Sequence, residues 1–150
     1  MPASASDQQP YLASQVRTKA ELAVAQFQQR AGGRLDYSEK SLSVIEEMLE
    51  EASRYRTQMP QKDIEAIVGL MGSYILEVTH RKYGGTFQWH EQRAQPVLVV
   101  GEPQFHVAIM TFDKVRGRLS GDKGDNIPFF FQGFADRVKS AKPGTKVLYV

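Results

Sequence analysis

Cysteine is absent from the 150-residue sequence. Its absence excludes disulfide bonds, thiolate nucleophiles, and zinc or iron–sulfur sites with cysteine ligands. No serine occurs in the G-x-S-x-G setting that presents the nucleophile of many hydrolases, and the chain has only three histidines. No catalytic set of residues is therefore visible, which favours a non-catalytic protein over an enzyme.

Long apolar runs are also missing. No segment approaches the ~20 apolar residues that span a bilayer, and the first residues, MPASASDQQP, lack the basic and apolar regions of a secretory signal. These features predict a cytoplasmic protein with no membrane partner. The apolar fraction of 41% and the charged fraction of 24% are typical of a globular domain. We expect residues 1–8 to be disordered and residues 9–150 to form a single domain.

The net charge of +2 is small but unevenly distributed. Residues 1–80 contain 8 Lys/Arg and 11 Asp/Glu, a net charge of −3, whereas residues 81–150 contain 11 and 6, a net charge of +5. Two complementary solvated surfaces explain this distribution more simply than a basic binding patch does. The sequence therefore argues against a nucleic-acid partner, although aromatic residues of a predicted strand at 86–90 could stack on bases.

Helices and strands are predicted in separate parts of the chain. Apolar residues recur at helical spacing at about 9–29, 39–53 and 60–83, and again at 111–121 and 127–141. Strands are predicted at 86–90, 96–100, 104–110 and 145–150. This segregated order predicts an α+β fold, in which three N-terminal helices pack on a small, mostly antiparallel sheet, with one or two further C-terminal helices.

The predicted helix at 60–83 has two different sides. Its apolar residues lie within about 60° of Met71 on a helical wheel; they are Ile64, Ile67, Val68, Tyr74, Ile75 and Val78. The opposite side consists of Gly69, Gly72, Ser73, Leu76 and His80. A glycine inside a helix costs ~1 kcal/mol relative to alanine, so two of them indicate close packing on this side. We expect this helix to be the central one, between two layers.

Glu77 and His80 form a single E-x-x-H motif on this helix. Di-metal helix bundles need the motif twice, together with two further glutamates, and His90 and His106 fall on predicted strands. A site formed by the three histidines has no characteristic spacing to support it, so we expect no metal and no cofactor. Arg81 follows Glu77 at the spacing of an i,i+4 ion pair. We favour this pair, at the edge of the core, over a buried Glu77 carboxylate that serves a pocket.

Three consecutive phenylalanines, Phe129, Phe130 and Phe131, lie near the start of the predicted helix at 127–141. Together they span about 200° of the helix circumference. They cannot all face one core unless this helix is covered on more than one side. Burial under a neighbouring element is one interpretation, and an exposed phenylalanine that anchors a protein interface is the other.

Several short motifs occur in a characteristic order: LDYS at 35–38, GSYILEV at 72–78, the double glycine at 84–85, and Trp89. They resemble the L-D-x-S, G-x-Y-x-G-E-V and G-G-x-W pattern of a group of uncharacterised bacterial proteins, classed as domains of unknown function. The resemblance covers about residues 35–110 and implies an α+β domain and a bacterial source, but it supplies no activity. Leu76 stands where the pattern has a glycine.

Two hypotheses for the function follow. The first is a bacterial protein that binds another protein, in the manner of an immunity or adaptor protein, through the phenylalanine cluster. The alternative is a small-ligand-binding protein or enzyme with a pocket between the central helix and the sheet, lined by Tyr74, Glu77, His80 and Trp89. A weaker third hypothesis is nucleic-acid association through the basic half, which predicts steeply salt-dependent binding.

Overall fold

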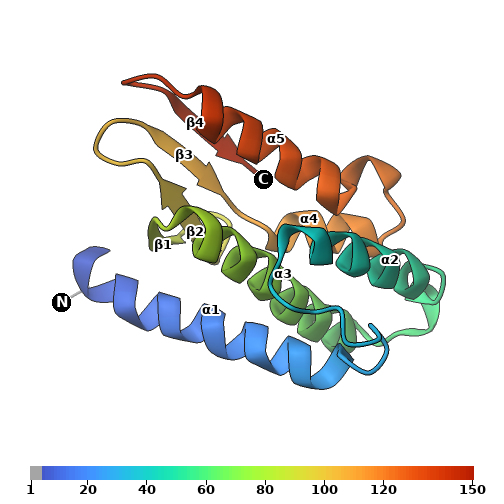
Figure 1. The fold of residues 1–150 in the computed structure, drawn as a ribbon. Coiled ribbons are helices and arrows are strands. Elements are labelled where there is room, and N and C mark those ends of the chain that lie inside the picture. Colours follow the sequence, from blue (N-terminus) through green and yellow to red (C-terminus); the bar gives the residue numbers. More distant parts are fainter. Residues whose placement is uncertain (1–4) are drawn as a thin grey trace.

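The computed structural model describes residues 5–150 of the chain, with side chains from residue 8 onward. Its helices are α1 (Ala5–Phe27), α2 (Leu42–Ser53), α3 (Gln61–Tyr83), α4 (Phe112–Leu119) and α5 (Ile127–Ser140). Its strands are β1 (Thr86–His90), β2 (Gln95–Val100), β3 (His106–Ile109) and β4 (Lys146–Tyr149) (Figure 1). The predicted α+β class is confirmed, because the first three helices precede the sheet and two more follow its third strand.

The N-terminal prediction falls partly outside the described residues. Residues 1–4 lie outside them, so the prediction of disorder there concerns a segment that the structure does not describe. Residues 5–8 form the first turn of α1, which therefore begins earlier than the position near Gln9 that the apolar spacing indicated.

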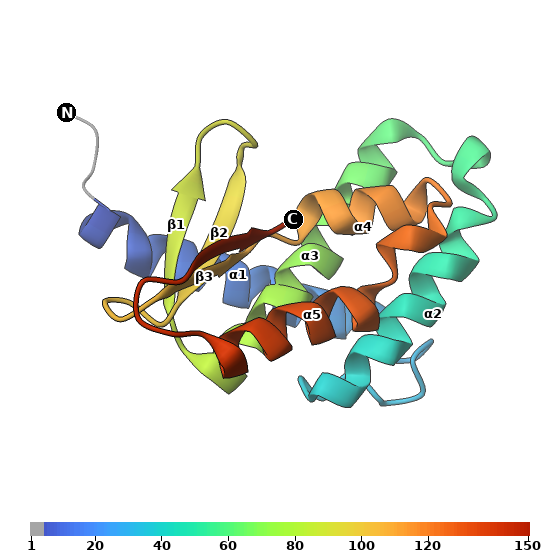
Figure 2. The same ribbon diagram turned by 90° about the horizontal axis from the view of Figure 1, so that it is seen from above.

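The sheet has the strand order β1-β2-β3-β4. The first three strands are antiparallel neighbours, whereas β4 pairs with β3 in parallel. A parallel pair needs a long crossover connection, which α4 and α5 provide. Figures 1 and 2 show the sheet at one end of the molecule and α2 at the other. The prediction of a small, mostly antiparallel sheet is confirmed.

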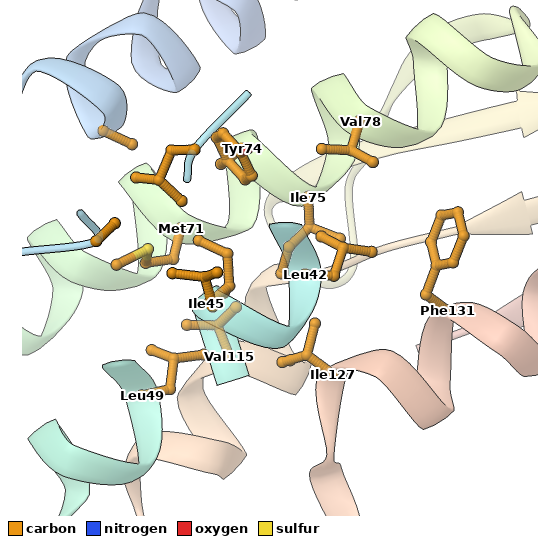
Figure 3. Close-up of a cluster of buried hydrophobic side chains, with 14 of the residues drawn as sticks. Leu42, Ile45, Leu49, Met71, Tyr74, Ile75, Val78, Val115, Ile127 and Phe131 are labelled. Carbon is orange, nitrogen blue, oxygen red and sulfur yellow. The ribbon is translucent and has the colours of Figure 1, made fainter. Parts of the chain in front are cut away.

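Helix α3 has a hydrophobic cluster on each side, as its two-sided pattern predicted. On the first side, Met71, Tyr74, Ile75 and Val78 pack against residues of α2, α4 and α5 (Figure 3). Leu76 faces the other way and belongs to a second cluster, between the helices and the sheet. This second cluster also contains Leu12, Val16, Phe87, Leu98, Val107, Ile109, Phe130 and Phe134.

Gly72 lies where α4 begins against the small-residue side of α3. A Cβ at this position would be 2.5 Å from Cδ1 of Phe112, which is closer than real side chains approach. The Thr111 hydroxyl donates a hydrogen bond to the carbonyl oxygen of Gly72 at 2.7 Å. The prediction that a glycine here permits close packing is confirmed, and the contact fixes the Phe112 ring beside α3.

A buried ion pair joins three of the helices. Nε of Arg118, on α4, donates to Oε2 of Glu46, on α2, at 2.6 Å, and these side chains are 4% and 14% exposed. The other carboxylate oxygen of Glu46 accepts from the backbone N–H of Ile127, the first residue of α5. One carboxylate therefore holds α2, α4 and α5 together. Across residues 5–150, no helix has the length and hydrophobicity that crossing a bilayer requires.

Candidate ligand-binding site

The four residues predicted to share a pocket lie in different surroundings. Tyr74 is fully buried on the core side of α3. Its hydroxyl oxygen accepts a hydrogen bond from the backbone N–H of Tyr37 at 2.9 Å and lies 2.7 Å from the Ser41 hydroxyl. Burial raises the pKa of the Tyr74 phenol above its ordinary value. With both of these contacts made inside the protein, Tyr74 is a structural residue.

Glu77 forms the predicted ion pair. Nε of Arg81 donates to Oε1 of Glu77 at 3.1 Å, and the two side chains are 48% and 7% exposed. The guanidinium of Arg81 also lies over the Tyr37 ring, with Cζ 3.7 Å from the ring centre. The Glu77 carboxylate is thus buried, and its partner is the arginine one helical turn away.

The three histidines have separate neighbours. The His80 ring lies 5.0 Å from the Phe87 ring, and Nδ1 of His106 is 3.2 Å from a carboxylate oxygen of Glu102. Nδ1 of His90 accepts from the backbone N–H of Arg93. Among the residues whose side chains the structure describes, no three His, Asp or Glu side chains gather closely enough to hold a metal ion.

Trp89 lines a cavity of about 240 Å³ between α1, α3 and the β1–β2 hairpin. Apolar side chains make most of its wall, and they come from four elements: Leu12 and Val16 on α1, Trp89 on β1, Pro96 on β2 and Phe112 on α4. Figures 1 and 2 show α1 running beside this hairpin. Ligand sites commonly combine such apolar walls with a few polar groups. Of the four residues predicted to line a pocket between the central helix and the sheet, Trp89 alone lines this cavity.

Ser73 contributes a hydroxyl to the wall of this cavity. Its side chain is 1% exposed, and its Oγ has no hydrogen-bond partner among the described residues. A serine or threonine inside a helix can bond the carbonyl four residues earlier, as Thr79 does to Ile75 on the same helix. Ser73 does not use this option, so its buried hydroxyl is without a hydrogen-bond partner beside the cavity.

Lys19 is the one charged residue among those that line the cavity. Its Nζ lies over α3, 3.8 Å from where a Cβ on Gly69 would be. Within residues 8–150, no carboxylate lies within 4.0 Å of this ammonium group. The cavity therefore has a positive charge that no carboxylate among the described side chains pairs.

Two other hollows have different linings. A cavity of about 360 Å³ between α1, α2 and α3 is lined by Phe27, Met48 and Tyr55, with Arg30 and Glu51 supplying both signs of charge. A groove of about 230 Å³ lies on the face of the sheet away from the helices, over Val97, Val99 and Ala108. Neither is lined by a buried polar atom that lacks a partner.

The phenylalanine cluster divides between core and surface. Phe130 and Phe131 are 8% and 1% exposed, and they pack in the two hydrophobic clusters on either side of α3. Phe129 is 78% exposed. The prediction of an interface formed by all three needs correction, because Phe130 and Phe131 point into the interior and only Phe129 is available to a partner.

Comparison with known proteins gives no match: none among protein-family models, curated proteins or solved structures. The resemblance to the uncharacterised bacterial group therefore stays a prediction, and the function is inferred from the site alone.

Sequence reasoning found one of the residues that line the cavity and missed the others, including Ser73 and Lys19. Trp89 was among the predicted site residues. Ser73 was visible as part of the small-residue side of α3, but packing explained that side equally well. Lys19 gave no signal, because an isolated lysine on an amphipathic helix is ordinary and its approach to Gly69 is a tertiary contact.

Proposed function

We propose that this protein binds a small organic molecule in the cavity between α1, α3 and the β1–β2 hairpin. The unpartnered hydroxyl of Ser73 supports this proposal best. Burying a hydroxyl without a hydrogen bond costs about 1–3 kcal/mol. A ligand that bonds to Ser73 Oγ would recover part of this energy, whereas a purely structural cavity would gain by having alanine at this position.

The surroundings of the cavity suit binding rather than chemistry. Its polar lining consists of the Lys19 ammonium, the Ser73 hydroxyl and the Gln15 amide. No carboxylate or imidazole lines it to act as a general base toward the hydroxyl or toward a ligand. Its walls belong to helices and strands that pack tightly, including the Phe112 ring held against Gly72. A site of this kind holds a ligand in one orientation without an evident means of transforming it.

The test is an NMR titration of the ¹⁵N-labelled protein with indole, phenol, phenylacetate and phenylacetamide. At least one probe should shift the backbone amide of Ser73 and the indole N–H of Trp89, the single tryptophan of the chain. Trp89→Ala should weaken that binding. Tyr55→Ala, which truncates a half-exposed aromatic residue of the other helical cavity, is the matched control and should not. Probes that shift nothing, or that shift only residues around Tyr55, would overturn the proposal.

A second candidate function is binding of another protein, and the exposure of Phe129 favours it. This candidate keeps the expected immunity- or adaptor-like role in a bacterial cytoplasm. A large aromatic side chain that is 78% exposed can anchor an interface. Phe129→Ser should abolish capture of a specific protein from bacterial lysate, while Lys139→Ser, at an exposed position on the same helix, should leave it intact. Equal capture by both variants would remove Phe129 from this role.

A further inference from the structure

We infer that the ligand of this cavity is a small organic anion with one carboxylate and a flat apolar body. The inference rests on the proposed function, because it concerns the chemistry of a molecule in the same cavity. It follows from the charge of the lining, the spacing of two polar groups and the size of the space.

The charge of the lining selects an anion. Lys19 contributes one positive charge, and no acidic residue lines the cavity. The nearest acid in sequence to the lining residue Phe112 is Asp113. Its carboxylate accepts from Arg93 and Gln95 through Oδ2 and from Arg116 through Oδ1. Two arginines therefore already neutralise Asp113, which leaves little repulsion toward a ligand carboxylate.

The two polar groups lie one helical turn apart along α3. Nζ of Lys19 lies over Gly69 at 3.8 Å from its missing Cβ, and Ser73 follows Gly69 by four residues. Positions i and i+4 of a helix have Cβ atoms about 5–6 Å apart on the same face. Lys19 Nζ and the Ser73 side chain therefore lie over neighbouring turns of the same helix face. We expect one ligand carboxylate to accept from the ammonium with one oxygen and from the Ser73 hydroxyl with the other.

The remaining lining fits a flat apolar body. Trp89 and Phe112 offer aromatic surface, and Leu12, Val16 and Pro96 offer aliphatic surface. A volume of about 240 Å³ corresponds to roughly eight water molecules at the ~30 Å³ each occupies in the liquid. A ligand of about ten non-hydrogen atoms therefore fills it, and an aromatic ring with a short carboxylate arm has this size.

The ligand class can be tested with two probes of nearly equal shape. Phenylacetate carries the carboxylate, and phenylacetamide replaces it with a neutral amide. Calorimetric titration of the wild-type protein should show phenylacetate binding about tenfold more tightly, which corresponds to about 1.4 kcal/mol. Added sodium chloride should reduce the difference, because Lys19 is an exposed residue whose charge salt can screen.

Three variants test which residues cause the preference for phenylacetate over phenylacetamide. Lys19→Met keeps the aliphatic stem and should bring the affinity for phenylacetate down to that for phenylacetamide, without changing the latter. Ser73→Ala should weaken binding of phenylacetate severalfold. Lys62→Met, at an exposed position near the start of α3, is the charge-matched control and should retain the full preference. Thermal unfolding of each variant confirms that the fold is intact.

The outcomes separate this inference from the proposed function. Equal affinity for the two probes, with shifts at Ser73 and Trp89, would overturn the anion assignment and leave the cavity as a binding site for neutral molecules. Binding of indole or phenol alone would do the same. A preference for phenylacetate that persists in Lys19→Met would place the anion at another cation. Absence of binding by all four probes would overturn both the inference and the proposed function.

Discussion

The guanidinium of Arg81 stacks on the ring of Tyr37, with Cζ 3.7 Å from the ring centre. Tyr37 has a φ of 64°, in the left-handed region that non-glycine residues seldom occupy. The Tyr37 ring also stacks on the Tyr74 ring, with the two ring centres 5.1 Å apart. Two contacts therefore hold Tyr37 in this conformation. Arg81 thus joins the end of α3 to the segment before α2, and Glu77 orients it for this contact.

This arrangement predicts that Arg81 and Glu77 do not contribute equally to stability. Arg81→Met should lower the free energy of unfolding by about 1–2 kcal/mol, because it removes a cation–π contact and leaves a buried carboxylate without its counter-charge. Glu77→Gln should cost about 0.5–1 kcal/mol, since Arg81 is half exposed and water can solvate it. Urea unfolding followed by Trp89 fluorescence measures both values.

The same pair tests the original pocket hypothesis. Glu77 does not line the cavity that Trp89 lines, so Glu77→Gln should leave binding of the aromatic probes unchanged. A loss of binding in a folded Glu77→Gln protein would return Glu77 to the site. A larger loss of stability for Glu77→Gln than for Arg81→Met would contradict the stacking account.

Two glycines of α3 should respond in opposite ways to alanine. Gly72→Ala should destabilise the protein by about 1–3 kcal/mol, because the new methyl group would meet the Phe112 ring at 2.5 and 2.9 Å. Gly69→Ala should be neutral or stabilising by up to about 1 kcal/mol, since its Cβ would touch only Lys19 Nζ at 3.8 Å and alanine favours the helix. Thermal unfolding of the two variants checks the contrast. Similar gains for both would mean that α4 does not approach α3 closely in solution.

Much of the fold was predictable because its determinants are local. The two-sided pattern of α3 indicated that this helix lies between two layers. Apolar residues such as Met71 and Ile75 recur on one face with the helical period, and small residues such as Gly72 lie on the opposite face. The β-branched run at 97–100 identified a buried strand for a similar reason. The parallel pairing of β4 with β3 was not predictable, because pairing depends on the crossover through α4 and α5 rather than on residues of the strand.

The candidate site was less predictable because tertiary contacts create it. Glu77 drew attention as a charge in an apolar segment, but its partner Arg81 lies on the same helix and satisfies it locally. Lys19 and Ser73 line the same cavity only because α1 packs against α3. The Phe129–Phe131 run indicated that the three side chains cannot all face one core unless the helix is covered on more than one side. Which of them is buried depended on how α5 lies between the two clusters.

The buried phenol of Tyr74 predicts a loss of stability at high pH. Burial raises its pKa in the folded protein, whereas in the unfolded chain the value is about 10. The stability that the neutral Tyr74 phenol contributes to the fold is therefore complete below about pH 10. It is lost as the pH rises from there through the folded-state pKa, because the phenol ionises at a lower pH in the unfolded chain. Tyr74→Phe has no phenol hydroxyl to ionise at this position. It should be less stable at neutral pH by about 1–2 kcal/mol, since the Tyr37 N–H and the Ser41 hydroxyl lose a partner.

Unfolding in urea at a series of pH values tests this prediction. The free energy of unfolding should fall more steeply between about pH 9 and 11 in the wild-type protein than in Tyr74→Phe. Tyr11→Phe, which changes a tyrosine that is 65% exposed, should follow the wild-type curve. Parallel curves for wild type and Tyr74→Phe would show that this phenol ionises equally in both states.

The ion pair between Glu46 and Arg118 predicts a strong coupling that can be measured directly. Arg118→Met should lower the free energy of unfolding by about 3–5 kcal/mol, because the Glu46 carboxylate stays buried with only the Ile127 N–H as a close partner. Glu46→Gln should cost a similar amount by leaving the guanidinium, 4% exposed, with Glu50 at 3.9 Å as its nearest acid. The double variant removes both charges and should lose less stability than the sum of the losses of the single variants.

Arg54→Met, which breaks an exposed pair with Glu50 at 3.7 Å, is the control and should cost less than about 1 kcal/mol. Additive losses in the double variant would show that the two charges do not depend on each other, and that α2, α4 and α5 are held together by the apolar cluster alone.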